Sequence, residues 1–278
     1  MSIIAEAVFD KSPDDSGYER IRTWLNARCG IYYAEKKKEL LSQRLARVLE
    51  RFGLSDLEEL ADCVETGQKG DVEQAVVDVA STNHTYFFRE PQVLDYFSNT
   101  ILPNLAHKPA LHIWSAAAST GDEAYTLAIL AAEIMGPEQA ASRVSILGTD
   151  ISAPVIKRAE AAVYGAAHLE HAPEYLLQRY FEPAEAGDLR VVPHIQRMCT
   201  FRRLNLKARP FPFHRPFDVV CCRNVLYYFD RVNQRRTLEA LFDVTERGGW
   251  LLTSVTESVR DLGTRWCWVG GGIYRKLA

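Results

Sequence analysis

The sequence predicts an α/β fold, in which a parallel sheet carries helices on both faces, preceded by an all-helical N-terminal domain. After about residue 110, apolar and partly β-branched runs alternate with helical patterns, an order typical of a buried parallel sheet. Before that point no strand pattern occurs, so we expect a helical domain and linker at 1–90 and the α/β domain at 91–278. The strand patterns lie at 111–118, 144–151, 217–229 and 250–258.

Helical patterns at 122–135 and 232–247 separate these runs, but two segments break the alternation. Residues 181–206 predict a small inserted antiparallel β subdomain, with DLRVVP and CTFRRL as its candidate strands. The ending CWVGGGIYRKLA predicts a hairpin around a glycine turn, a common way to finish a sheet edge.

Composition excludes several classes of protein. Hydrophobic residues make up 47% and charged residues 25% of the 278 residues, as in ordinary globular proteins. The N-terminal run MSIIAEAVFDKSPDD lacks the pattern of a signal peptide, and no apolar run approaches the roughly 20 residues of a membrane span. We therefore expect a cytoplasmic protein without membrane insertion. The net charge of −3 gives no pull toward nucleic acid, and the six cysteines show no CxxC pair, so we predict neither a metal site nor disulfides.

The N-terminal domain contains a strongly basic stretch. Residues 18–51 hold nine Lys or Arg against four Glu, whereas 52–79 hold eight acids against one Lys. Apolar residues at 41, 45, 48 and 52 recur at helical spacing, which predicts an amphipathic helix over 36–52. A solvated helix face and a docking surface for an acidic partner fit this pattern equally well. The basic side consists of Lys37, Arg44, Arg47 and Arg51.

Helical patterns continue over 54–80. Ser55 is the expected N-cap of the first helix there, and GQKGD predicts the turn before the next helix.

The end of the first predicted strand leads into a turn of small residues that closes with Gly121. Such a turn lets backbone approach a ligand beside a helix N-terminus. It has one glycine and no basic residue, so it is a weak pattern for a pyrophosphate. Asp122 and Glu123 open the following helix and suit a cationic ligand or ribose hydroxyls, although acids at this position also stabilise a helix dipole.

Asp150 stands at the tip of the second predicted strand, where an acid can accept both hydroxyls of a ribose. It could instead cap the next helix, a role for which Ser152 competes. Taken together, the acids favour an adenosyl ligand without phosphates, which points to S-adenosylmethionine.

The third predicted strand ends at Arg223 and Asn224. The amide of Asn224 offers a donor and an acceptor to a methionyl amino-carboxylate. Cys221 and Cys222 are best explained as buried packing, since no activating group lies beside them. Tyr227 and Tyr228 follow, and we expect one of them in the core.

The run STNHTYFFRE at 81–90 combines hydrogen-bonding side chains, paired aromatics and an arginine before Pro91, so it is an improbable helix interior. A linker would explain it, but we favour a clamp over the ligand pocket.

These motifs together resemble the CheR family of chemotaxis receptor methyltransferases, over residues 18–276. The resemblance rests on several independent motifs in the family's order. They are Asn83-x-Thr85-x-Phe87-Phe88-Arg89-Glu90, Trp114 to Gly121 with Glu123 and Tyr125, Thr149-Asp150-Ile151-Ser152, Asn205-Leu206, Phe217-Asp218, Cys222-Arg223-Asn224-Val225 and Tyr228-Phe229.

The resemblance implies a Rossmann-like S-adenosylmethionine-dependent enzyme that methylates glutamate side chains of a methyl-accepting chemotaxis receptor and releases S-adenosylhomocysteine. It places Arg89 and Tyr228 nearest the reacting methyl group. It also implies that the basic helix docks on the acidic methylation helices of the receptor. The residues it places around the cofactor are Asn83, Thr85, Arg89, Glu123, Asp150, Asn205, Leu206, Arg223 and Asn224.

The sequence departs from the family pattern in three places. Asp122 and Ala124 replace residues that the family often has as Glu or Gln and Pro. The segment 181–206 is short beside relatives that tether a receptor C-terminal peptide, so we do not count tethering among the expected contacts. The tail from 254 to 272 also differs, and nothing functional follows from it.

Two other functions fit part of the pattern. A non-catalytic adaptor that binds the cofactor would not need Arg89 or Tyr228. A methyltransferase of small carboxylic acids would not need the basic helix.

Overall fold

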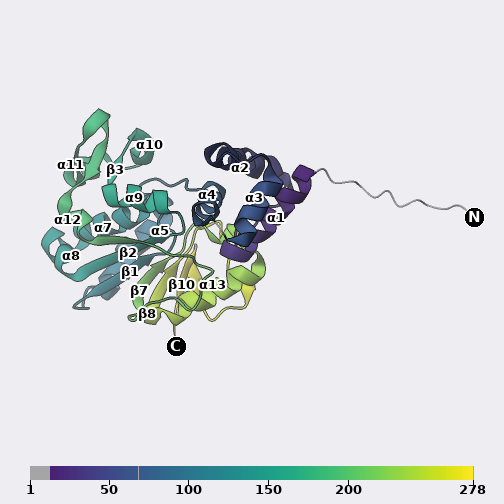
Figure 1. Cartoon of the computed structure of the whole chain (residues 1–278). Coiled ribbons are helices and arrows are strands. Elements are labelled where there is room, and N and C mark those ends of the chain that lie inside the picture. Colours follow the sequence, from purple (N-terminus) through teal and green to yellow (C-terminus); the bar gives the residue numbers. More distant parts are fainter. Residues whose placement is uncertain (1–12, 68, 278) are drawn as a thin grey trace, which may run out of the picture. The chain divides into compact units, whose positions relative to one another are not determined.

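The computed structural model describes residues 13–67 and 69–277 (Figure 1). The chain divides into two compact units, one up to Ser81 and the other from Thr82 onward, so the run at 82–90 belongs with the α/β part. The N-terminal run expected to lack a signal peptide lies outside the described residues as far as residue 12. Gln68 of the predicted GQKGD turn lies outside them as well.

The first unit is helical, as predicted. Each helix turns one apolar side inward, and the pairs α1 with α3 and α2 with α4 pack together. Gly17 lies at the closest approach of α1 to α3, where a Cβ would come within 2.5 Å of the Leu57 carbonyl carbon. The elements are α1 (Pro13–Cys29), the 3₁₀ turn η1 (Glu35–Lys37), α2 (Lys38–Phe52), α3 (Leu57–Thr66) and α4 (Gly70–Ala80).

The expected N-cap of this helix, Ser55, is wrong. The N-cap of α3 is Asp56. The Asp56 carboxylate accepts the Glu59 amide at 2.9 Å. The Glu59 carboxylate in turn accepts the backbone N–H of Ser55 at 2.8 Å. Ser55 is thereby drawn into a reciprocal cap, which moves the start of the helix one residue along.

The amphipathic character of α2 is confirmed, because Leu41, Leu45 and Val48 are buried. The basic side is not uniform, however. The guanidinium of Arg44 donates to the Tyr33 hydroxyl at 3.1 Å and to carbonyls at the end of α4. Arg44 therefore holds the unit together, whereas Arg47 and Arg51 are exposed.

The second unit is built on a seven-stranded sheet in the order β6-β2-β1-β7-β8-β10-β9. The first five strands run parallel, and the C-terminal hairpin joins antiparallel, as predicted. The strands are β1 (Leu111–Ser115), β2 (Val144–Asp150), β6 (Cys199–Arg203), β7 (Phe217–Cys221), β8 (Thr245–Leu252), β9 (Cys267–Gly270) and β10 (Ile273–Arg275).

Alternation along the strands sends neighbouring side chains to opposite faces, where they build two cores. Ile113 packs with α7 and α9, whereas Trp114 packs with α13 and the 206–217 loop. Helices thus cover both faces (Figure 1). One face carries α5 (Pro91–Tyr96), the π-helical turn η2 (Phe97–Ile101), α6 (Leu102–Leu105), α7 (Asp122–Met135), α8 (Pro137–Arg143) and α9 (Ala153–Ala161), and the other carries α13 (Arg231–Asp243).

A separate three-stranded antiparallel sheet, in the order β3-β5-β4, confirms the predicted small β subdomain. Its membership differs from the prediction, because CTFRRL is β6 of the main sheet, parallel to β2. The subdomain instead starts at residue 163. Its elements are β3 (Val163–Tyr164), α10 (Ala166–Leu169), α11 (Glu174–Tyr180), β4 (Phe181–Pro183), η3 (Glu185–Gly187), β5 (Leu189–Val191) and α12 (Pro193–Gln196).

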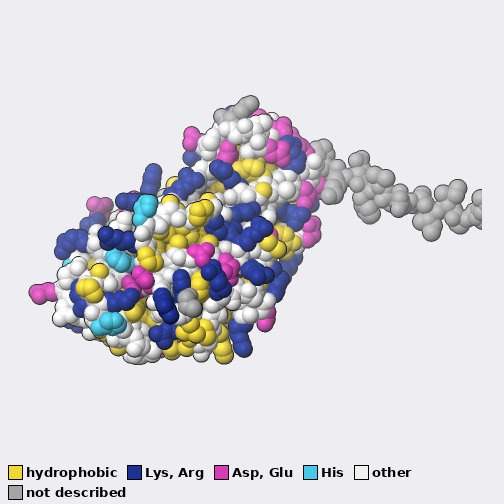
Figure 2. Space-filling model, turned by 90° about the horizontal axis from the view of Figure 1, so that it is seen from below, with side chains coloured by type: hydrophobic (Ala, Val, Ile, Leu, Met, Phe, Trp, Pro, Cys, Tyr) yellow, Lys and Arg dark blue, Asp and Glu magenta, His cyan; other side chains and the backbone are white. Residues whose placement is uncertain are grey.

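The face seen in Figure 2 intersperses hydrophobic, basic and acidic side chains. Among the described residues, no helix combines the length and the apolar character that crossing a bilayer requires.

Candidate active site

The candidate site lies at the carboxyl edge of the main sheet, beside the point where strand order reverses. The chain passes from β1 outward to β2 and later returns to place β7 on the other side of β1. Ligands of open α/β sheets bind at such a point. The residues that follow β1, β2 and β7 are those that the sequence singled out.

A buried ion pair lies at the centre of this edge. The Glu123 carboxylate accepts the Ser115 hydroxyl at 2.7 Å and a guanidinium N–H of Arg223 at 3.0 Å. Arg223 also donates to the backbone carbonyl of Arg89, which ties the 81–90 run to the sheet. Its Nε is buried with no hydrogen-bond partner among the described residues.

Glu90 forms the second anionic partner of this cluster. It accepts the side-chain amide of Asn224 at 3.0 Å, the Ser254 hydroxyl at 2.7 Å and the Val255 amide at 3.1 Å, and its carboxylate lies 3.5 Å from Arg223. Burial alone would raise the pKa of Glu90, but these hydrogen bonds and the Arg223 charge together lower it. Glu90 and Asn224 both have positive φ, at 58° and 57°, a conformation common where a site is held rigidly.

Asp150 joins the loops that follow β1 and β2. Its two carboxylate oxygens accept the backbone amides of Ser119 and Ser152, each at 3.0 Å. Ser152 is the N-cap residue of α9, without a side-chain capping bond. The Ser119 hydroxyl donates to the Asn83 carbonyl at 3.2 Å, which brings the 81–90 run to this loop as well.

The two acids at the start of α7 have different surroundings. Asp122 is fully buried, and its carboxylate is occupied by the Thr120 hydroxyl and by His168 Nδ1, both at 2.6 Å. Of the predicted pair, only Glu123 contacts the Arg223 cluster, so Asp122 is structural.

Packing requires a glycine at position 121, whatever binds beside the turn. The φ of Gly121 is +93°, and a Cβ there would lie 2.9 Å from the Cβ of Ala159 and 3.0 Å from the Tyr164 hydroxyl. The turn therefore lies directly against α9 and the small subdomain.

Arg89 and Tyr228 lie half-buried near this cluster. The Arg89 guanidinium donates to the His84 carbonyl at 2.9 Å and lies over the Tyr86 ring. Tyr228 lies in the 3₁₀ turn η4 (Leu226–Tyr228) and accepts the Tyr227 hydroxyl at 3.2 Å. It packs partly against the core on the sheet face that α13 covers, here called the α13-side core. Tyr227 is exposed, so Tyr228 is the tyrosine that the core partly covers.

The remaining predicted residues lie around the same edge with fewer contacts. The Leu204 amide donates to the Asp150 carbonyl at 2.9 Å, which places the following loop beside β2. In that loop the Asn205 side chain accepts the Lys207 amide, and Leu206 is buried in the α13-side core. Thr85 is half-buried in the 81–90 run.

Sequence reasoning missed Glu257, which anchors the turn that carries Tyr228. Its buried carboxylate accepts the backbone amides of Asn224 and Leu226 at 2.8 Å, with longer bonds from Tyr227 and Ser254. Burial raises the pKa of Glu257, although these amides act in the opposite direction. The only trace in the sequence is its place just after a strand end. Glu90 was noticed within its motif but given no role.

The chemistry of this edge fits S-adenosylmethionine. The cofactor carries a sulfonium, an ammonium and a ribose diol, for which Glu123 and Asp150 supply negative charge and acceptors. It also carries one carboxylate, for which the unpartnered Nε of Arg223 and the amide of Asn224 supply donors.

Comparisons with known proteins agree with this chemistry. Residues 83–269 match the S-adenosylmethionine-binding domain of CheR methyltransferases, and residues 16–79 match their all-alpha domain. The chain is 34% identical over 239 residues to the chemotaxis protein methyltransferase of Borreliella burgdorferi, covering 83% of this chain and 84% of that protein. It is 32% identical over 251 residues to chemotaxis protein methyltransferase 1 of Vibrio cholerae, covering 89% and 91%. It is 32% identical over 266 residues to the chemotaxis protein methyltransferase of Escherichia coli, covering 94% of this chain and 90% of that protein.

Proposed function

We infer the residue roles below from the premise that this chain belongs to the CheR methyltransferase family. It is an S-adenosylmethionine-dependent enzyme that methylates glutamate side chains of a chemoreceptor, giving glutamyl methyl esters and S-adenosylhomocysteine. The observation that supports the residue roles is the Glu123–Arg223–Glu90 cluster at the sheet's switch point.

For cofactor binding we assign the ribose hydroxyls to Asp150, whose position between two loops supports that role. Glu123, Arg223 and Asn224 hold the methionyl end. The 81–90 run, with Asn83, Thr85 and Arg89, covers the cofactor, and the loop at Asn205 and Leu206 borders the adenosine.

The reaction needs no general base, because a glutamate carboxylate is already ionised at neutral pH, its reference pKa being about 4.3. When bound, the cofactor supplies the methyl group and keeps the electron pair of the broken carbon–sulfur bond. The protein's task is alignment, with one carboxylate oxygen about 3 to 3.5 Å from the methyl carbon. Arg89 orients the substrate carboxylate, and the Tyr228 hydroxyl lies beside the transferring methyl. Exclusion of water helps, since the two reacting charges cancel.

For the receptor we assign the exposed basic residues of α2, Arg47 and Arg51, with Lys37 just before the helix. Leu40 is 42% exposed on the same helix and offers an apolar contact beside these charges. Such a surface would attract acidic receptor helices and weaken with salt. We propose no contact with a receptor C-terminal peptide. Because the methylation helices of the proposed receptor lie in the cytoplasm, we propose the same location for this enzyme.

The direct test is transfer of radiolabelled methyl from S-adenosylmethionine to membranes that contain the host's chemoreceptors. We expect label on receptor peptides that alkali releases as volatile methanol, since carboxyl esters hydrolyse in base. A chain that binds cofactor but labels no receptor would instead be an adaptor, and label only on small carboxylic acids would identify the other alternative.

A further inference from the structure

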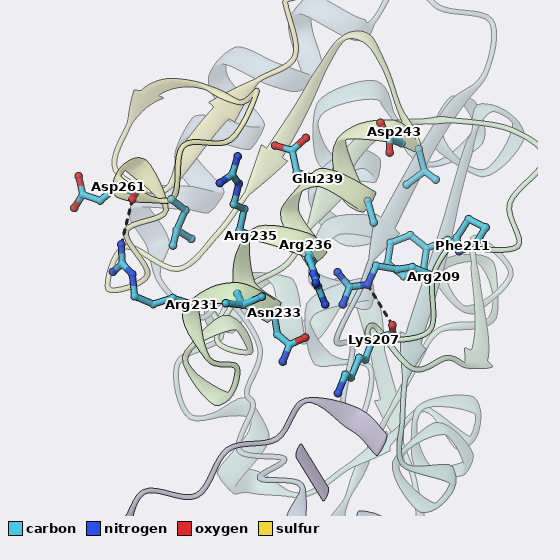
Figure 3. A pocket seen from close by; sticks show the side chains of 15 residues that line it. Lys207, Arg209, Phe211, Arg231, Asn233, Arg235, Arg236, Glu239, Asp243 and Asp261 are labelled. Carbon is cyan, nitrogen blue, oxygen red and sulfur yellow. Dashed lines mark hydrogen bonds between the residues drawn. The ribbon is translucent and has the colours of Figure 1, made fainter. Parts of the chain in front are cut away.

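A hollow of about 1000 Å³ lies along α13 (Figure 3). None of the residues assigned to the cofactor lines it, although Lys207, which does, directly follows Leu206 in the chain. Its walls are the 207–211 loop, one side of α13, and the 3₁₀ turn η5 (Arg260–Leu262), all within the second unit. The volume is at the upper end of small-molecule sites, roughly 300–1000 Å³. None of its residues has a role in methyl transfer as described above.

The hollow is rich in basic side chains. Five basic side chains line it against three acids. Two of these acids, Glu239 and Asp243, are already paired with Arg265 at 2.5 and 2.6 Å. In Figure 3 the carboxylate of Asp261 points away from the centre. The basic residues are Lys207, Arg209, Arg231, Arg235 and Arg236.

Arg209 and Arg236 are close enough in this hollow for their charges to interact (Figure 3). Within the described part of the chain, no carboxylate comes within 4.0 Å of either guanidinium. Arg209 is half-buried, and both its burial and the neighbouring Arg236 charge lower its pKa. Arg236 is exposed, and an anion between the two guanidinium groups would relieve the repulsion of their like charges.

The planar guanidinium of arginine donates two parallel hydrogen bonds to the oxygens of a phosphate, which the point charge of a lysine cannot do. A pair of arginines therefore suits a phosphate group. A helical protein partner would present a convex surface that cannot reach into the hollow. The concave shape and the half-buried Arg209 therefore favour a small ligand that enters it. We propose that this hollow is a binding site for a small phosphorylated molecule, with a phosphate group held between Arg209 and Arg236. The proposal does not depend on the identity of the methyl acceptor.

Titration calorimetry of the full chain with inorganic pyrophosphate, at constant ionic strength and without magnesium, tests this site. The double variant Arg209→Gln/Arg236→Gln should bind pyrophosphate at least about tenfold more weakly, since it loses two charge-assisted contacts. The matched control is Arg247→Gln, because Arg247 is exposed and lies outside the hollow, and it should bind as the wild type does. Retained binding of S-adenosylhomocysteine shows that the double variant is folded, and if it is not, Arg236→Gln alone should give several-fold weaker binding.

Three results would overturn the proposal. The first is no measurable heat with wild type up to millimolar pyrophosphate. The second is equal affinity of wild type and of the folded variant. The third is a Glu-rich helical peptide that binds wild type and loses affinity in the variant while pyrophosphate does not bind, which would identify an acidic protein as the occupant.

Discussion

Arg223 carries a positive charge on a side chain that is only 4% exposed, and its main compensation is Glu123 at 3.0 Å. A charge buried this deeply depends on its partners, because its lost hydration is recovered only through them, and the second carboxylate, Glu90, lies farther away at 3.5 Å. At the scale of single residues, this pair therefore contributes to stability as well as to the cofactor site.

We expect Glu123→Leu to lower the free energy of unfolding by about 3 kcal/mol, the lower end of the range for breaking a buried ion pair, because Arg223 would keep only the more distant Glu90 carboxylate and the Arg89 carbonyl. Urea denaturation measures the change. The control is Arg179→Leu, which breaks an ion pair with Glu133 at an arginine that is 57% exposed and should cost at most about 1 kcal/mol. Similar losses in both variants would show that the Arg223 pair has no special role.

Arg89→Ala and Tyr228→Phe should each lower the rate of methyl transfer at saturating cofactor by at least about tenfold, because each removes a group that aligns or stabilises the reacting atoms. Initial rates on receptor membranes measure this. Tyr175→Phe, at a tyrosine that is 60% exposed on α11, is the control and should leave the rate unchanged. Both roles are wrong if the two variants turn over as fast as the wild type.

The contact between His168 and buried Asp122 makes stability depend on pH. The hydrogen bond that the His168 imidazole makes to the Asp122 carboxylate is the main cause that raises the pKa of His168 above its usual 6.5. A group with a raised folded-state pKa stabilises most below its unfolded pKa, and the gain disappears as pH rises through the folded value. His168→Gln should therefore cost more stability at pH 6 than at pH 8.5.

Denaturation midpoints of both proteins at the two pH values decide this prediction. A cost of His168→Gln that does not vary with pH would mean that the imidazole is neutral throughout, and the contact would then be an ordinary hydrogen bond.

At the scale of elements, helices and strands with a one-sided apolar pattern were predictable from sequence. The run at 122–135 is helix α7 with the same bounds, because its apolar residues and its opening acids are local signals. The strand β6 was recognised as a strand but assigned to the wrong sheet. Its alternation shows one buried face, but its partner β2 lies about fifty residues earlier, and periodicity says nothing about such a pairing.

Arg44 shows a similar limit within one helix. Spacing placed it on the basic side of α2, correctly, but its partners are carbonyls at the C-terminal end of α4, where a cation is favourable. Such a contact between two helices has no signature in the sequence of either one.

Because Arg44 is bonded within the first unit whereas Arg47 and Arg51 are exposed, only the latter two are suitable for testing the receptor surface. Arg47→Glu/Arg51→Glu should raise the KM for receptor membranes at least about tenfold with little change in cofactor affinity, because the change removes long-range attraction to an acidic partner. Arg44 is unsuitable, since its reversal would disrupt the first unit. Arg158→Glu, at an exposed arginine of α9, is the control. An unchanged KM would show that the receptor does not dock on this side of α2.

At the scale of the whole molecule, the site draws on segments from 83 to 257, brought together by the order of the parallel strands. The sequence predicted Glu123, Asp150, Arg223 and Asn224 because strand ends converge at one edge. It did not predict the role of Glu257, because the backbone amides that Glu257 accepts become neighbours only after folding. The Arg89 contact to Arg223 runs through a carbonyl and was equally hidden.

All the residues assigned to the cofactor lie in the second unit, so binding should stabilise that unit selectively. At a concentration of S-adenosylhomocysteine about 100 times its Kd, the expected gain is about 2.7 kcal/mol. Hydrogen exchange followed by mass spectrometry should show slower exchange in 83–90, 115–123 and 223–228, whereas α1 to α4 should exchange as before. Equal protection of the helical unit would mean that the cofactor couples the two units, and protection absent from 83–90 would remove the clamp from the proposed site.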